Sequence, residues 1–519
     1  MKIKRTASSM LASVGLVAGT FCAQIAVWAP GHAAALTTHH ITTCSELQAI
    51  NDSPGTWADS FVLDNNIDCS ASSGWNDGAG FIPIGLNSET AFTGTFDGQG
   101  YTISDLYIND TSDFGEGLFS QVDNAIIHNI DFDGGSVTGY FAVGVAVGAA
   151  YDDTEVEDIT SNVPVSGEYA VGGAVGSLAG TDGAIIGNIA TSGNVTGTGA
   201  GNAVGGVVGD FEGLGTEVQA ALVTSHTSGV ISGEVHVGGL VGYAGGSVGI
   251  QLDYATGTAS ANDGYVGGLI GEVDQLGYTG LLSTTIDTSY ATGGAIAGTG
   301  ESGYVGGLIG FSQGAEGVGI GIQQVFATGD ADASDQTGML GGVGGLIGEA
   351  YHTQISDSYA TGNVTTMDTG GDAGGLVGAM AYSDSDILNS YATGDVTAYN
   401  YLGGLVGNFS GDVTESFALG NVNGLGDEDA DTAGLLGVVC TDGCGDDVVD
   451  AYWSSTASGQ EHCERNYNDS NEPVSEVGCT DESASYFNNN STNPPFDAWD
   501  FVSTWETHTS APPTLRFAD

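Results

Sequence analysis

Val266-Gly267-Gly268-Leu269-Ile270-Gly271 is one copy of a six-residue string that recurs through the middle of the chain and decides its fold. The same letters stand at 305–310 and 343–348, and close variants stand at 143–148, 171–176, 204–209, 237–242, 373–378, 402–407 and, shortened to five residues, 433–437. Successive copies lie about 30 residues apart, which is the signature of a tandem repeat. Glycine therefore fills 88 of the 519 positions.

A second string falls between most of these copies. It is Tyr-Ala-Thr-Gly or a close variant, at 254–257, 290–293, 326–329, 359–362, 391–394 and 417–420. Both strings are short and rich in glycine, and glycine inside a helix costs about 1 kcal/mol relative to alanine. Each repeat is therefore predicted to hold at least two short strands separated by turns.

One such repeat cannot bury its own apolar side chains, so successive repeats are expected to stack. Stacking predicts an aromatic ladder of Tyr254, Tyr290, Phe326, Tyr359 and Tyr391. It also predicts a ladder of leucines, one from each first string, at Leu240, Leu269, Leu308, Leu346, Leu376 and Leu405. The predicted fold is all-β, a parallel β-helix or β-solenoid of roughly ten glycine-rich repeats. A β-propeller is the alternative, but its blades need four strands each.

The repeats occupy the middle of four predicted segments. Residues 1–35 read as a signal peptide, because Lys2, Lys4 and Arg5 precede an apolar run and a small-residue cleavage site. Residues 36–115 are predicted to form an N-terminal cap with the first coils, 116–437 the repeat solenoid, and 438–519 a cysteine-containing C-terminal cap.

The N-terminal cap carries a helix signal. Thr43 and Glu46 have the spacing of a capping box, which predicts a short helix, followed by a first strand at 61–67. His39 and His40, just before it, are predicted to lie in a frayed terminus.

The charge of the chain excludes several partners. It has 64 acidic and 5 basic residues, and Arg465 and Arg516 are the only cations after residue 35, histidine aside. This excess of negative charge repels phosphate backbones and anionic membrane surfaces, so nucleic acid is excluded as a partner. Glycine and aspartate interrupt every apolar stretch after the signal, so no membrane span is expected in the mature chain.

Cysteines stand only near the two ends of the mature chain. Cys22 leaves with the signal, and the six disulfide candidates that remain are Cys44, Cys69, Cys440, Cys444, Cys463 and Cys479. The first two are predicted to pair with each other, whereas the connectivity of the last four stays open. A zinc site is the alternative for those four.

The repeats also resemble a known family. The run F-T-G-T-F-D-G-Q-G-Y-T-I-S-D-L-Y-I at 92–108, together with the two recurring strings, is similar to GLUG-motif proteins of bacterial surfaces over about residues 44–515. The resemblance implies a carrier segment of a secreted, adhesin-like surface protein, some of which are fused to peptidases. It implies no role for the cysteine-rich insert at 440–479.

Catalytic motifs give weak signals. Gly245-x-Ser247-x-Gly249 has the letters of a nucleophile elbow, but no helix is predicted after it. The histidines include no H-E-x-x-H, so a zinc peptidase of that type is not expected. The acid pairs weighed for a two-acid hydrolase are Asp131 with Asp133, Asp152 with Asp153, and Asp384 with Asp386.

One acidic string has the spacing of a calcium loop. Asp427, Asp429 and Asp431 form D-x-D-x-D, although Thr432 and Val438 depart from the EF-hand pattern. These three aspartates are the calcium candidates, and a solvated turn is the alternative.

Two functions follow as hypotheses. The first is a secreted or cell-surface solenoid that is not an enzyme, is adhesin-like or structural, binds a surface glycan or protein ligand, and needs no cofactor other than possible calcium. The second is a carbohydrate-active enzyme, either a polysaccharide hydrolase or a calcium-dependent lyase, on a β-helix. An enzyme needs a place where long coils and acids meet. The longest coils, which end at Gly310 and Gly348, hold few acids in their interruptions: Glu301, Asp330, Asp332 and Asp335.

Overall fold

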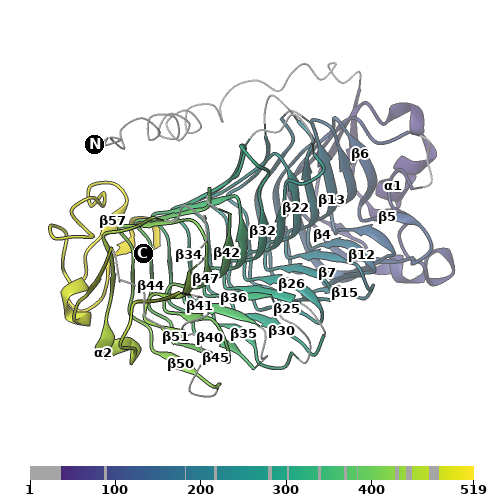
Figure 1. Cartoon of the computed structure of the whole chain (residues 1–519). Helices are drawn as coiled ribbons and strands as arrows, with labels where there is room; N and C mark the ends of the chain where they lie inside the picture. The colour runs from purple at the N-terminus through teal and green to yellow at the C-terminus, as the bar shows by residue number, and fades with distance from the viewer. Residues whose placement is uncertain are drawn as a thin grey trace.

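The chain forms a parallel β-helix in which coils stack along one axis, from the N-terminal end in purple to the C-terminal end in yellow (Figure 1). This computed structural model describes residues 37–86, 90–181, 183–215, 219–278, 283–300, 303–336, 341–367, 371–382, 384–426, 432–439, 447–466 and 478–518. The predicted fold is confirmed. The four segment boundaries remain a prediction.

Three parallel sheets line the β-helix, and each regular coil runs from sheet C to sheet B and then to sheet A. Sheet C has 11 strands: β5 (Phe114–Glu116), β8 (Phe141–Val143), β12 (Tyr169–Gly172), β16 (Ala203–Gly205), β21 (His236–Gly238), β26 (Gly264–Gly267), β31 (Gly303–Gly306), β36 (Gly342–Gly344), β41 (Asp372–Gly374), β46 (Leu402–Gly403) and β51 (Thr432–Ala433). Sheet B has 12 strands: β6 (Phe119–Asp123), β9 (Val147–Tyr151), β13 (Val175–Gly180), β17 (Val208–Gly213), β22 (Val241–Gly246), β27 (Ile270–Asp274), β32 (Ile309–Gln313), β37 (Ile347–Tyr351), β42 (Val377–Ala381), β47 (Val406–Phe409), β52 (Leu436–Val439) and β55 (Glu464–Asn466).

Sheet A holds the remaining parallel strands. Its early strands are β4 (Thr95–Asn109), β7 (Ile126–Thr138), β10 (Glu155–Ser161) and β14 (Ile185–Thr191). The second string forms its short strands, with His226–Thr227 in the equivalent place: β19 (His226–Thr227), β24 (Tyr254–Ala255), β29 (Tyr290–Ala291), β34 (Phe326–Ala327), β39 (Tyr359–Ala360), β44 (Tyr391–Ala392) and β49 (Phe417–Ala418). In the next coil the corresponding strand is β54 (Ala451–Trp453).

The first string makes the bend between sheets C and B, and its two central glycines explain why it recurs. A Cβ on Gly267 would lie 1.9 Å from the carbonyl oxygen of Ile270, and one on Gly268 would lie 2.1 Å from that of Gly307 in the next coil. No other residue fits such approaches. The leucine that follows is buried in each of the six coils for which the ladder was predicted, so the leucine ladder is confirmed.

The aromatic ladder is also confirmed. Tyr254 and Tyr290 stack with ring centroids 4.9 Å apart, and the later rungs follow at 4.7, 5.0 and 5.0 Å with ring planes within a few degrees of parallel. The ladder is longer than predicted, because His226 stacks on its first ring at 4.6 Å and Phe417 on its last at 4.8 Å.

The C-terminal segment folds back over the later rungs. Trp505 packs 6.1 Å from Tyr391, whose hydroxyl donates to the carbonyl of Pro513 at 2.7 Å. Phe517 packs 5.7 Å from Phe326, and the C-terminus lies beside β34 in Figure 1. The antiparallel hairpin of β57 (Trp505–Glu506) and β58 (Thr514–Leu515) holds this segment together. The rungs from Phe326 onward are consequently buried.

The N-terminal cap follows its sequence signal in part. Helix α1 (Cys44–Gln48) begins with the predicted capping box of Thr43 and Glu46. The prediction of a frayed terminus is wrong, because residues 38–41 form β1 (Thr38–Ile41), which pairs with β2 (Ser60–Leu63). The predicted strand at 61–67 is two strands, β2 and β3 (Ile67–Asp68).

The histidines of β1 are held by carboxylates. A ring nitrogen of His39 lies 2.8 Å from Asp59, and one of His40 lies 2.8 Å from Asp64. Both acids lie on or beside the neighbouring strand, so strand pairing and these contacts together order the predicted loose end.

Disulfides close both ends of the β-helix. Cys44 is bonded to Cys69, and Cys463 to Cys479. Cys440 and Cys444 lie outside the described residues. In the part of the chain that the structure describes, the only group of potential metal ligands is Cys463, Glu464 and Cys479, whose two sulfurs are already bonded to each other. No helix within that part has the length and apolar character to cross a membrane.

Candidate functional site

Eight side chains meet along the bend between sheets C and B, and this line of residues is called the stripe. Sheet C contributes successive register partners His236, Tyr265 and Tyr304. Sheet B contributes five successive partners, Asp210, Tyr243, Glu272, Phe311 and Glu349. Each residue directly precedes or follows a copy of the first string, so the bend brings the two columns together.

Aromatic rings form the centre of the stripe. The centroids of Tyr265 and Tyr304 are 5.2 Å apart, and Phe311 lies 5.3 and 4.9 Å from them, with all three rings stacked. Phe311 is only 5% exposed, whereas the two tyrosines are half-buried. Tyr351 contacts the edge of Phe311 at 5.4 Å. The cluster therefore offers flat apolar surface with hydroxyl groups at its margin.

Carboxyl groups flank these rings. Glu272 lies 2.9 Å from a ring nitrogen of His236, and Glu349 accepts hydrogen bonds from the hydroxyls of Tyr351 and Tyr304. Both acids are under 10% exposed. Burial raises the pKa of Glu349 although the tyrosine hydrogen bonds oppose that shift.

Among the acids of the stripe, the largest shift in pKa is that of Asp210, at the N-terminal end. Burial, helped by Glu212, raises the pKa of Asp210 to about 7. Tyr243 lies one coil further along, and its hydroxyl donates to Asp274 at 3.4 Å. Several buried groups with shifted pKa values in one place are typical of a functional site.

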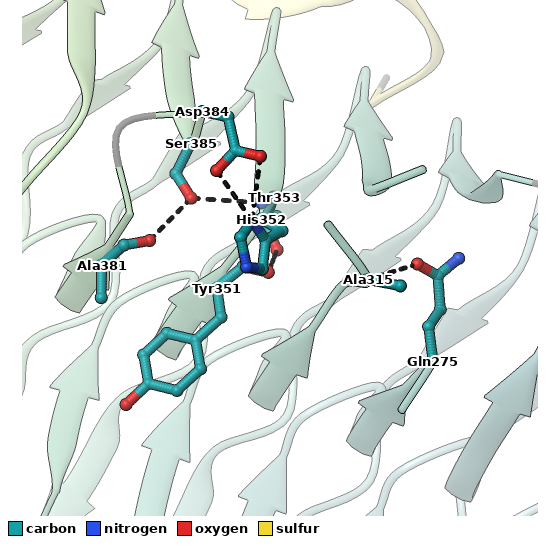
Figure 2. Close-up of polar contacts among 8 residues, drawn as sticks. All are labelled: Gln275, Ala315, Tyr351, His352, Thr353, Ala381, Asp384 and Ser385. Carbon is teal, nitrogen blue, oxygen red and sulfur yellow. Dashed lines mark hydrogen bonds and ion pairs between the residues drawn. The ribbon is translucent and has the colours of Figure 1, made fainter. Parts of the chain in front are cut away.

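A residue from one of the two longest coils lies at the edge of the stripe. Tyr278, which follows β27 in the coil that ends at Gly310, donates its hydroxyl to Glu212 at 2.7 Å. Gln275 accepts from the backbone N–H of Ala315 at 3.0 Å, which ties successive segments together (Figure 2).

A histidine–aspartate pair lies just beyond the stripe. One ring nitrogen of His352 lies 2.7 and 2.9 Å from the two carboxylate oxygens of Asp384, and the imidazole stacks on Tyr382 at 4.3 Å. In Figure 2 the ring of Tyr351 extends away from this pair. The nearby Ser385 donates to the carbonyl of Ala381 at 2.9 Å and is fully buried, so its hydroxyl serves the backbone.

The acid pairs considered from the sequence serve the framework. Asp131 accepts from Thr102 and Thr160, and Asp133 from Asn162. Asp153 of the second pair accepts from Thr181 at 3.1 Å.

In the third pair, Asp384 is taken by His352, and burial raises the pKa of Asp386 to about 6. Ser247 is buried between β22 and β23 (Val248–Gln251), and no helix follows it. The calcium candidates Asp427, Asp429 and Asp431 lie outside the described residues and remain a prediction.

The stripe was not predicted from the sequence, although a signal for it exists. The string itself is nearly constant, but the residue on each side of it varies between coils. In coils that hold the stripe, at least one flanking position carries a ring, an acid or a histidine, whereas later coils carry Ala379 and Asn408 in the sheet B column. Variable positions beside a constant turn were the available clue.

The structure is a parallel β-helix built from repeated coils and capped at both ends. Comparison with protein families identifies the repeat. The GLUG motif matches residues 340–365 and 369–397, which confirms the resemblance drawn from the strings. The chain therefore contains at least two copies of the GLUG motif. It is 34% identical to Halomucin of Haloquadratum walsbyi in an alignment that covers 76% of this chain and 5% of Halomucin, so it spans a small part of that relative's length.

Comparison with solved structures also finds similar chains. The crystal structure of a "putative immunoglobulin A1 protease" from Bacteroides ovatus aligns with 95% of this chain and 96% of that chain. The two are 15% identical and the TM-score is 0.29.

Proposed function

We propose that this protein is a secreted or cell-surface, adhesin-like β-helix that binds a glycan at the stripe and leaves it chemically unchanged. The observation that carries the proposal is the stacked cluster of Tyr265, Tyr304 and Phe311, bordered by Glu272 and Glu349. Half-buried rings pack against the apolar faces of sugar rings, and carboxylate oxygens accept hydrogen bonds from sugar hydroxyls. Aromatic surface with a few placed polar groups is typical of ligand sites.

The charge of the molecule narrows the ligand class. A formal charge of −59 disfavours uronates, sulfated glycans and other polyanions, so the proposed ligand is a neutral glycan. This binding mode requires no cofactor, and calcium enters it only as a counter-ion to the excess carboxylates. The leader-like residues 1–35 and the two disulfides support a location outside the reducing cytosol.

One observation favours the enzyme as a second candidate. Glu272 and Glu349 stand on either side of Phe311 in the sheet B register, two strand spacings apart, which is about 9.5 Å. That value lies at the upper end of the range for the two acids of an inverting glycosidase. Binding is favoured because Glu272 is paired with His236 and Glu349 is held by two tyrosines, which occupies both acids.

A glycan array, run with and without calcium, selects the ligand for the test. Its best neutral oligosaccharide is then titrated into the mature protein and into Tyr304→Ala, with Tyr140→Ala as the matched control, because Tyr140 is an exposed tyrosine on another part of the surface. We expect Tyr304→Ala to bind at least about tenfold more weakly and the control to bind normally. Equal affinity in all three proteins would remove the stripe as the site.

A parallel assay for new reducing ends separates the two candidates. We expect none from the wild-type protein. Reducing ends that appear and are abolished by Glu272→Gln would establish the hydrolase instead.

A further inference from the structure

The aromatic ladder has one open end, at His226. Its register column in sheet A continues toward the N-terminus as Ala190 and Thr160, so rings give way to small side chains. One face of the imidazole stacks on Tyr254, with the planes 8° apart. On the other side the next register position holds only the methyl group of Ala190. The rung that would continue the ladder is missing there.

A cavity of about 270 Å³, open to solvent, occupies this place. Its lining includes Asp131, Thr160, Ala190, Ser192, His226 and Ser228. Apart from the ring at its edge, the lining consists mainly of hydroxyls, one amide and one carboxylate. The volume lies below the range of about 300–1,000 Å³ for drug-sized ligands, which suits a single small ring.

The lining of the cavity is rich in hydrogen-bond acceptors. Asp131 accepts from Thr102 at 3.0 Å and from Thr160, and each carboxylate oxygen keeps a further lone pair. The hydroxyl oxygens of Ser192 and Ser228 can also accept. An acceptor-rich lining matches a ligand that carries many hydroxyl donors.

The protein itself shows that this face of sheet A binds flat rings. Its C-terminal segment places Trp499, Trp505 and Phe517 against the later rungs, and Phe517 reaches Tyr290 at 6.4 Å. Beyond that contact Tyr254 and His226 are only half-buried. Burial lowers the pKa of His226, so near neutral pH its imidazole is uncharged and apolar across its face.

We propose that the cavity beside His226 is a second binding site, for one hexopyranose ring of a neutral glycan, which stacks on the free imidazole face as the missing rung. The carboxylate of Asp131 within the lining disfavours a uronate there. This site lies on sheet A, away from the bend that carries the stripe, and it does not depend on the function proposed for the stripe.

The test uses the whole mature chain and four probes: neutral hexasaccharides of glucose, mannose and galactose, and hexagalacturonate. Binding is measured by saturation-transfer NMR and calorimetric titration. Ala190→Tyr places the ladder's own ring in the cavity, and His226→Ala removes the stacking face. We expect at least one neutral hexasaccharide to bind, each substitution to weaken it at least about tenfold, and hexagalacturonate to bind more weakly.

Tyr304→Ala separates this site from the stripe. Binding that survives Tyr304→Ala but is lost in Ala190→Tyr supports the second site, even if the stripe binds nothing. The inference is overturned if no neutral hexasaccharide binds, if both substitutions leave affinity unchanged, or if hexagalacturonate binds equally well. A melting curve checks that Ala190→Tyr is folded, and His226→Ala decides the matter if it is not.

Discussion

The molecule carries two lines of stacked rings, the aromatic ladder on sheet A and the stripe at the bend between sheets C and B. Within each line, the centroids of neighbouring rings lie about 5 Å apart. The ladder takes one ring from the same place in each coil from His226 to Phe417, and the C-terminal segment covers its later rungs. The stripe mixes rings with acids and borders the two longest coils. Residues that repeat build the fold, whereas the residues of the stripe depart from the repeat.

Energetic cost separates the two lines as well. The ladder buries apolar surface, which stabilises the stack. In the stripe, Glu272 and Glu349 are buried, and burial raises the pKa of Asp210. Moving a carboxyl group out of water costs free energy. The fold has no need of acids at these positions, because the same sheet B column is completed in later coils by Ala379 and Asn408.

The largest expected effect is on the ladder. Tyr391 is stacked on both faces and fully buried, so Tyr391→Ala should lower the free energy of unfolding by about 3–5 kcal/mol. Tyr391→Phe keeps the ring and loses only the hydrogen bond to Pro513, at about 1 kcal/mol. Urea unfolding followed by circular dichroism measures both. If Tyr391→Ala lowered the free energy of unfolding no more than Tyr391→Phe does, stacking in the ladder would not stabilise the fold.

The next effect concerns the N-terminal cap. The bond between Cys44 and Cys69 closes a loop of 25 residues, so replacing both by serine should cost about 3 kcal/mol in the chain-entropy account. The melting temperature of the double variant, compared with each single variant, measures this. Reactive thiols at these positions in the folded wild-type protein would show that the bond is absent in solution.

Replacing a buried acid outside the stripe should have a smaller effect on the free energy of unfolding, and it should raise that free energy. Both carboxyl oxygens of Glu116 lack a hydrogen-bond partner, and its register partner in the next coil is Val143. Glu116→Val should therefore stabilise the protein at pH 7 by about 1–3 kcal/mol and leave glycan affinity unchanged. A loss of affinity would show that acids outside the stripe also serve binding.

The gain from Glu116→Val should depend on pH. Burial raises the pKa of Glu116 from 4.5 to about 8, so the folded protein keeps this proton while the unfolded chain releases it. Wild-type stability should therefore fall as pH rises from about 4.5 to 8, and the variant should lack that part of the fall. Melting curves across this range test the sign. A constant difference between the two proteins would exclude this titration as the cause.

The smallest expected effect is a general one. Repulsion among 64 acidic residues is screened by salt, so the melting temperature should rise by a few degrees with NaCl and further with millimolar calcium. Magnesium at equal ionic strength is the control for a specific calcium site. A melting temperature that ignores salt and chelator alike would mean that the carboxylates already lie too far apart to repel.

The parts predicted from the sequence are those encoded in every coil. The leucine ladder and the rings from Tyr254 to Tyr391 recur at fixed places, and the capping box of Thr43 is a local signal. The first string was predicted to be a strand, but its central residues form the bend between β26 and β27. The stripe was missed because its members meet only once the bend sets sheet B against sheet C, and the variable positions beside the constant string were its only signal in the sequence. The packing of the C-terminal segment over the ladder could not be predicted either. The hydrogen bond from Tyr391 to Pro513 joins residues 122 positions apart, and no repeating pattern in the sequence connects them.

The stripe is proposed to bind glycan and the ladder to stabilise the fold. These two roles are tested most directly by a matched pair of tyrosines, Tyr265 in the stripe and Tyr359 in the ladder. Glycan affinity and melting temperature are measured on Tyr265→Ala and Tyr359→Ala in the same buffer. We expect Tyr265→Ala to bind at least about tenfold more weakly with little change in melting temperature, and Tyr359→Ala to melt several degrees lower while its folded fraction binds normally. Loss of stability in both variants with affinity unchanged would contradict the account.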